Sequence, residues 1–384
     1  MAFVLSEEQI MIQTMAHDFA REVILPGAAE RDRSHEFPAD NLRQMGELGF
    51  MGMMVPDTYG GAGVDAVSYV LALTEIAYAC ASTAVVMSVH NSICCESVLH
   101  FGSEEQKRYW LPPMCTGECI GAFALTEPHA GSDPSSQRTT AVADGDEWVI
   151  NGAKQFITTG KNAGVIIVTA VSDRSKRHRG ISAFLVPQGT PGLIVGKAEE
   201  KLGLRASDTV QLIFEDCRVP KSAMLGKPGE GFRVAMAALD CGRIGIAAQS
   251  VGVAQACLDE AMEYTKNREQ FGQLLSDFQG LRWRMAEMAC EIEASRLLCL
   301  NAASLKDLGR RYTMEASMAK MFASEMVNRV AGQALQMHGG YGYCSEYAIE
   351  RHYRDARVFT IYEGTSEIQR VVISNNLLGP GTRR

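Results

Sequence analysis

The sequence predicts an α+β protein in which a helical block, a β-rich block and a second helical block follow one another. Apolar residues recur at helical spacing before residue 120 and after residue 228, and short runs rich in β-branched residues fill the segment between them. A doubly wound parallel sheet is disfavoured, because strands and helices do not alternate. We therefore divide the chain into an N-terminal α-helical domain (1–120), a middle β domain (121–228) and a C-terminal α-helical bundle domain (229–384).

The N-terminal domain carries two helix-start signals. In Ser6-Glu-Glu-Gln9 and again in Ser103-Glu-Glu-Gln106, the serine caps the helix and the glutamine returns the hydrogen bond. After the first signal, Met11, Met15 and Phe19 recur every fourth residue. This spacing predicts a helix with these side chains on one apolar face.

The middle domain changes to the shorter period of strands. We predict strands at 139–143, 147–150, 165–171, 181–186 and 209–214. Several short strands with turns and no helical pattern between them indicate an antiparallel sheet or a small barrel.

The C-terminal domain returns to long helical patterns at 234–266, 278–306 and 312–337, which are rich in alanine and methionine. Helices of this length pack as an antiparallel bundle.

Composition and charge exclude several classes of protein. The formal net charge is −8, whereas nucleic-acid binding needs clustered positive charge. The eleven cysteines have scattered spacings that suit free thiols, and no His/Cys cluster has zinc spacing, so we expect no metal site. Residues 70–89 are apolar but interrupted by polar side chains, which predicts a buried helix and not a membrane span. We also expect no targeting segment, because the N-terminal residues lead almost directly into a helical pattern.

One segment has the composition of a ligand-binding loop. Phe123-Ala-Leu-Thr-Glu-Pro-His-Ala-Gly-Ser-Asp133 follows a strand end and is rich in residues that leave backbone N–H groups exposed. An ordinary polar loop explains this segment equally well. No Gly-x-Gly-x-x-Gly follows a strand and opens a helix, so a Rossmann nucleotide site has little support.

Four motifs, in order along the chain, resemble the signatures of the acyl-CoA dehydrogenase family. They are the 123–133 segment, Arg268-Glu-Gln-Phe-Gly272 with Gln279, Gln336-Met-His-Gly-Gly-Tyr-Gly342, and Ile361-Tyr-Glu-Gly-Thr-Ser-Glu-Ile-Gln-Arg370. The similarity covers nearly the whole chain and is greatest to the short-chain (butyryl-CoA) dehydrogenases. It implies a helical N-terminal domain, a middle β domain and a C-terminal four-helix bundle.

The resemblance implies FAD as cofactor and assigns residues to it. The flavin ring and its surroundings would be contacted by Phe123, Leu125, Thr126, Gly131, Ser132, Phe156, Ile157, Thr158, Thr365 and Glu367. The pyrophosphate and adenosine would be contacted, from a neighbouring subunit, by Arg268, Gln279, Gln336, Gly339 and Gly340. The family often has tryptophan at the position of Phe156, and a phenyl ring still stacks but with less area. Arg268 as a solvated charge and Gly339–Gly342 as a helix end remain as structural alternatives.

The resemblance also assigns substrate contacts to Ser132, Asp240, Arg243 and Gly364. Asp240 and Arg243 are three residues apart on a predicted helix, so the plain alternative is that they pair with each other.

The same resemblance implies that Glu363 is the catalytic base. It would remove the α-proton of a short straight or branched acyl-CoA, while flavin N5 accepts the β-hydride, giving the trans-2-enoyl-CoA. Some relatives carry this carboxylate in the helix instead, but that position here is Gly242. An ion pair of Glu363 with Arg354 or Arg357 is the structural alternative.

The expected electron acceptor is an electron-transferring flavoprotein. An oxidase that uses dioxygen and a non-catalytic acyl-CoA-binding protein are the alternatives. We expect a homotetramer, built as a dimer of dimers, in the bacterial cytoplasm or, as a mature form, in the mitochondrial matrix.

Overall fold

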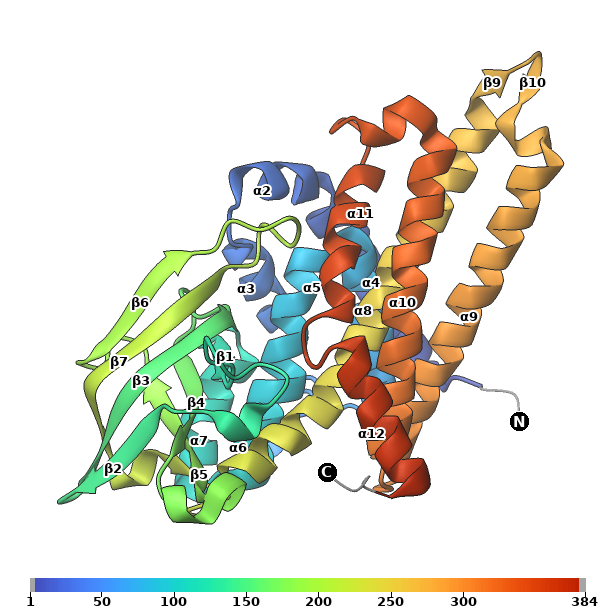
Figure 1. Cartoon of the computed structure of the whole chain (residues 1–384). Helices are drawn as coiled ribbons and strands as arrows, with labels where there is room; N and C mark the ends of the chain where they lie inside the picture. Colours follow the sequence, from blue (N-terminus) through green and yellow to red (C-terminus); the bar gives the residue numbers. More distant parts are fainter. Residues whose placement is uncertain (1–3, 380–384) are drawn as a thin grey trace.

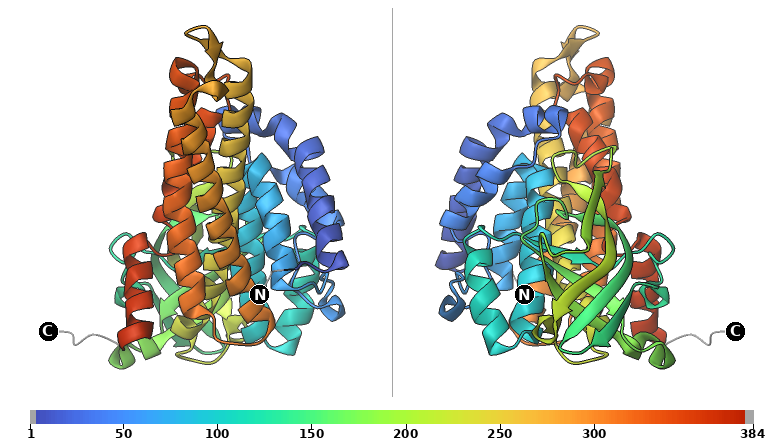
Figure 2. Two further views of the ribbon diagram at one scale, coloured as in Figure 1. Left: turned by 90° about the vertical axis from the view of Figure 1, so that its right-hand side faces the viewer. Right: turned by 90° about the vertical axis from the view of Figure 1, so that its left-hand side faces the viewer.

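The computed structural model describes residues 4–379 and has the three predicted parts in the predicted order. The β-rich part lies on one side and the long C-terminal helices on the other (Figure 1). The N-terminal helices run beside the long helices, as Figure 2 shows from two sides. Among the described residues, none of the helices is both long and apolar enough to cross a membrane.

The N-terminal part is helical. Its helices are α1 (Glu7–Phe19), α2 (Ala28–Ser34), α3 (Ala39–Glu47), α4 (Ala66–Ala79), α5 (Ala81–Ser88), α6 (Glu96–Phe101) and α7 (Glu104–Cys115), with a π-helical turn, η4 (Val89–Cys95), between α5 and α6. Both predicted capping boxes are present, at Ser6 and Ser103.

The apolar face predicted for α1 is confirmed at Phe19 but is wrong by one residue at Met11 and Met15. Met11 and Met15 are 65% and 38% exposed, whereas Ile12, Ala16 and Phe19 are buried. Helix α1 packs against α4, and the stripe that begins at Ile12 is the one that faces it. Methionine spacing alone did not identify that stripe.

The middle part is one eight-stranded sheet. Seven of its strands lie in the order β6-β7-β3-β2-β4-β5-β8, and the eighth, β1, pairs with β4. Its strands are β1 (Gly121–Ala124), β2 (Thr140–Asp144), β3 (Glu147–Thr158), β4 (Val165–Val171), β5 (Ile181–Pro187), β6 (Leu193–Ala198), β7 (Thr209–Pro220) and β8 (Met224–Leu225). The sheet is not wholly antiparallel as predicted, because β1 and β2 both pair in parallel with β4. Strand β1 enters from α7 and leaves into a long loop, so no hairpin fixes its direction.

The C-terminal part contains three long helices and two shorter ones. They are α8 (Gly231–Asn267), α9 (Gln279–Asp307), α10 (Thr313–His338), α11 (Ile349–Ala356) and α12 (Ser366–Leu378). The hairpin of β9 (Glu269–Gln270) and β10 (Gln273–Leu274) connects α8 to α9. Helix α8 packs against α10, α9 and α4, which joins the two helical parts into one hydrophobic core.

Candidate active site

Glu363 lies in a short loop that leads into α12. Its φ is +51° and that of Gly364 is +91°, so two consecutive residues are left-handed, which only glycine adopts easily. The ammonium of Lys320, on α10, donates to the Gly364 carbonyl at 2.7 Å. The amide of Gln369, on α12, donates to the same carbonyl at 2.9 Å and to the Glu363 carbonyl at 3.3 Å. Two helices therefore hold the loop in its strained conformation.

The carboxylate of Glu363 is buried and unengaged. Although the residue is partly exposed, both carboxylate oxygens are buried, and neither has a hydrogen-bond partner within the described residues. Burial raises the pKa of Glu363 from 4.5 to about 7, and the nearby charges of Lys320 and Arg243 oppose this rise. A free carboxylate with a pKa near neutrality is suited to act as a general base.

Helix α8 makes room for this carboxylate at Gly242. A Cβ atom at Gly242 would overlap Oε2 of Glu363 and would lie 3.0 Å from its Cδ and 3.1 Å from Cδ1 of Ile93. The two positions considered for the base therefore face each other, and only Glu363 carries a carboxylate.

The arginines considered as structural partners of Glu363 are engaged elsewhere. Arg354 binds Asp32 and Glu350, each at 2.6 Å. Arg357 donates to a threonine hydroxyl in its own turn at 2.6 Å. The structural alternative for Glu363 is therefore not realised among the described residues.

Asp240 and Arg243 pair with each other, as the plain alternative expected. Nη1 of Arg243 lies 2.6 Å from Oδ1 of Asp240, and the hydroxyl of Thr313 donates to Oδ2 of Asp240 at 2.7 Å. Burial lowers the pKa of Arg243, although Asp240 and Glu363 oppose this. Within the described residues, the buried Nε of Arg243 has no partner. Contact of this pair with acyl-CoA stays a prediction.

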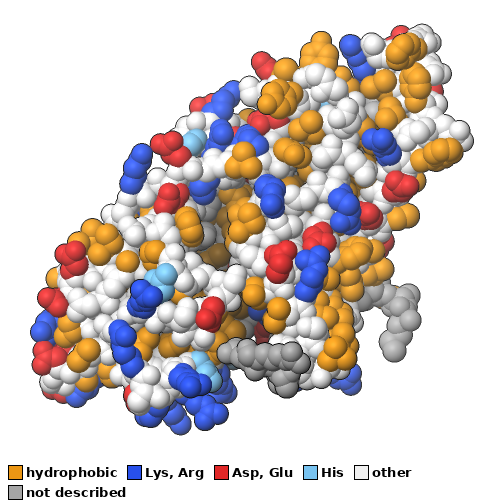
Figure 3. Space-filling view, viewed as in Figure 1, with side chains coloured by type: hydrophobic (Ala, Val, Ile, Leu, Met, Phe, Trp, Pro, Cys, Tyr) orange, Lys and Arg blue, Asp and Glu red, His pale blue; other side chains and the backbone are white. Residues whose placement is uncertain are grey.

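The segments predicted to line the flavin lie next to each other. Leu125 and Thr126 follow β1, and the N–H of Gln155, in β3, donates to the Thr126 carbonyl at 2.8 Å. Phe156 has a φ of +59° and is 63% exposed, although it is a large aromatic residue. Gly131 has open space where a Cβ would lie. An exposed ring beside an open, glycine-containing loop fits the flat ring system of a flavin. Figure 3 shows a hollow on this face, between the sheet and the helices.

Some of the predicted flavin contacts are restricted by the fold. Ile157 is buried in the core of the sheet, so only its backbone is left for a cofactor. Phe123 is half-buried against the main core. The hydroxyl of Thr365 accepts a hydrogen bond from the Ile368 N–H at 3.3 Å and so caps α12. Ser132 and Glu367 are exposed.

The predicted nucleotide contacts meet at the far end of the long helices. Arg268, Gln279 and Gln336 are exposed there, and the guanidinium of Arg268 lies 5.5 Å from the centre of the Tyr341 ring. Gly339 and Gly340 have open space where a Cβ would lie. In Figure 1 this end, with the β9–β10 hairpin, projects beyond the sheet. One protomer therefore does not bring the two sets of predicted FAD contacts together.

Sequence reasoning missed the residues that support the Glu363 loop. Lys320 is fully buried, and its charge in an apolar helical segment was the one available signal. Gln369 lies inside a motif that was noted, but its contacts depend on the loop conformation.

Comparisons with known proteins match this arrangement. Models of the N-terminal, middle and C-terminal domains of acyl-CoA dehydrogenase match residues 6–118, 122–217 and 229–378. The mitochondrial short-chain specific acyl-CoA dehydrogenase of Mus musculus is 51% identical over 374 residues, which cover 97% of this chain and 91% of that protein.

Two solved structures share the fold over nearly the whole chain. Butyryl-CoA dehydrogenase from Megasphaera elsdenii is 43% identical with a TM-score of 0.97, covering 98% of this chain and 100% of that one. A chain from the structure of the electron transferring flavoprotein of Acidaminococcus fermentans is 47% identical, with the same TM-score and coverage. These matches confirm the predicted fold class, family and enzyme class. The chain therefore belongs to the acyl-CoA dehydrogenase family, whose members are FAD-dependent oxidoreductases.

Proposed function

We propose that the protein dehydrogenates short-chain acyl-CoA thioesters between the α and β carbons, with Glu363 as the base that removes the α-proton. The observation that carries this proposal is the buried, unengaged carboxylate of Glu363, opposite Gly242 on α8. FAD, when bound, supplies the hydride acceptor.

The residues around Glu363 suit proton removal next to a thioester. Lys320 and Arg243 lie close enough to favour the carboxylate form, while burial keeps the carboxylate basic. Within the described part of the chain, the N–H of Glu363 makes no backbone hydrogen bond. It is therefore free to hold the thioester oxygen, which gains negative charge as the proton leaves. The product is the trans-2-enoyl-CoA.

Close packing beside Glu363 supports a short acyl chain. One turn beyond Gly242 on α8, a Cβ at Gly245 would overlap the hydroxyl of Ser88 and lie 2.9 Å from that of Tyr69. Tyr69 is fully buried, and its hydroxyl donates to the hydroxyl of Ser88 at 3.3 Å. The short-chain relative and the butyryl-CoA dehydrogenase point to the same size of substrate, straight or with a short branch.

The test is Glu363→Gln, which keeps the size of the side chain and removes the base. We expect anaerobic flavin reduction by butyryl-CoA to slow by about 10²–10⁴-fold, the usual share of general-base catalysis, with FAD content unchanged. Glu215→Gln, at an exposed carboxylate of β7, is the matched control and should reduce its flavin at the parent rate. Parent-like reduction by Glu363→Gln would refute the assignment.

The electron acceptor and the assembly belong to the same proposal. An electron-transferring flavoprotein accepts the electrons, and rapid reoxidation by dioxygen instead would identify an oxidase. The family resemblance implies a homotetramer. A second subunit is supported by the exposed aromatic residues Phe271, Trp283 and Tyr343, which need cover, and by the two sets of FAD contacts, which one protomer does not bring together. Sedimentation of the FAD-loaded protein as a monomer would contradict this.

A further inference from the structure

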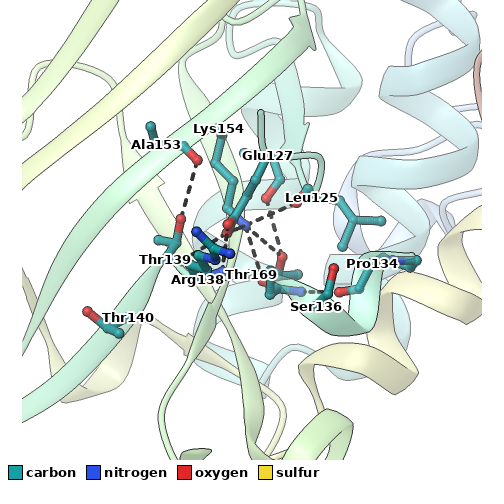
Figure 4. Close-up of polar contacts among 12 residues, drawn as sticks. Leu125, Glu127, Pro134, Ser136, Arg138, Thr139, Thr140, Ala153, Lys154 and Thr169 are labelled. Atoms are coloured by element: carbon teal, nitrogen blue, oxygen red, sulfur yellow. Dashed lines mark hydrogen bonds and ion pairs between the residues drawn. The ribbon is translucent and has the colours of Figure 1, made fainter. Parts of the chain in front are cut away.

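A buried ion pair lies behind the segments assigned to the flavin. Nζ of Lys154, in β3, is 2.9 Å from Oε1 of Glu127, in the loop after β1 (Figure 4). The side chains are 0% and 1% exposed, respectively. A buried pair of charges adds little stability over a well-packed apolar pair, so its presence here needs another reason.

Lys154 is bonded to the backbone of one flavin segment. Its ammonium donates to the Leu125 carbonyl at 3.0 Å and also to the side-chain oxygens of Gln137 and Thr169, at 3.1 and 3.4 Å. Leu125 is in the first segment assigned to the flavin, and Lys154 itself is two residues before Phe156, where the second begins.

Glu127, at the start of the 127–139 loop, binds the backbone at the end of that loop. Its carboxylate accepts the N–H of Arg138 at 2.6 Å and the N–H of Thr139 at 3.0 Å. The carboxylate therefore joins the start of the loop, next to Thr126, to its end at β2. Ser132, which is assigned to both flavin and substrate, lies within the loop closed in this way.

The ion pair contacts the flavin segments through backbone groups and not through the cofactor itself. Neither side chain is exposed, so neither reaches a cofactor on the open side of the loop. Together they fix the carbonyl of Leu125, both ends of the 127–139 loop and the residues that lead to Phe156.

We propose that Glu127 and Lys154 are positioning residues for FAD, whose buried ion pair holds the 123–132 and 156–158 segments in the relative geometry that the flavin needs. This rests on the placement of the flavin under the proposed function. It does not depend on Glu363 being the base.

The test compares FAD binding in Glu127→Gln, Lys154→Met and the double variant. FAD release from the holoenzyme on dilution gives the Kd, and the visible spectrum and two-electron potential report the flavin surroundings. Each single variant leaves an unpaired buried charge and releases part of the backbone of the flavin segments, so we expect it to lower thermal stability, to raise the Kd at least about tenfold and to shift the spectrum. The double variant leaves no unpaired buried charge, so it should recover part of the thermal stability that the single variants lose. It still lacks the ammonium that bonds the Leu125 carbonyl, so it should not recover the parent's Kd.

The control is Glu96→Gln, which breaks the ion pair at 3.1 Å between the buried Glu96 of α6 and the partly buried Lys306 of α9. It should lower thermal stability and leave the FAD Kd and spectrum unchanged. If the double variant folds and binds FAD with the parent's Kd and spectrum, the pair is only structural and the inference is wrong. Tight FAD binding without reduction by any acyl-CoA would sink the proposed function instead and leave this inference standing.

Discussion

Glu363→Gln should make the protein more stable at neutral and alkaline pH, although it removes the proposed base. The folded protein raises the pKa of Glu363 from 4.5 to about 7. The folded state therefore holds this proton more tightly than the unfolded chain, and stability falls as the pH rises between these two values. Above pH 7 the buried carboxylate is charged and has no partner.

The size of the effect follows from the pKa difference. A difference of about 2.5 units at 1.36 kcal/mol per unit corresponds to roughly 3 kcal/mol of stability lost at about pH 8. Near pH 5 the loss is less than about 1 kcal/mol, because the folded state keeps nearly all of the proton and this pH is only about half a unit above the unfolded pKa. Glutamine cannot ionise, so the variant should exceed the parent by roughly these amounts.

Thermal unfolding of both proteins, at matched FAD content and without acyl-CoA, measures this difference at several pH values between 5 and 8. Glu127→Gln is the control of opposite sign. Although burial alone would raise the pKa of Glu127, Lys154 and the Arg138 N–H lower it overall, so its loss should destabilise the protein at pH 8. A Glu363→Gln variant whose advantage does not grow with pH would refute the reasoning.

Three further predictions concern the same site and the helix ends. The rate of flavin reduction by butyryl-CoA should rise with pH around 7 as Glu363 ionises. Lys320→Met removes a neighbouring positive charge, so this rise should move to higher pH. Stopped-flow measurements of both proteins across pH check this. Gly242→Ala should slow the same reaction by displacing the Glu363 carboxylate, whereas Gly332→Ala on α10, where a Cβ meets only Tyr353 at 3.8 Å, should react at the parent rate. Ser103→Ala should cost about 1 kcal/mol in urea unfolding through loss of the α7 cap, and an unchanged midpoint would contradict that role.

The sequence alone determined what depends on local pattern. Capping boxes, long helical periods and short β-branched runs need only neighbouring residues, and they placed the three parts of the fold. Four motifs in order then determined the family. A motif also located Glu363, because the residues around it are contiguous in the chain.

Only the tertiary structure decided what surrounds these residues. The buried stripe of α1 depends on how it meets α4, and the direction of β1 depends on its pairing with β4. The residues that surround Glu363 include Gly242, 121 positions earlier in the chain, and Lys320, 43 positions earlier. Burial, which shifts the pKa of Glu363 and makes its missing partner significant, is a property of the packed molecule, and no local pattern encodes it.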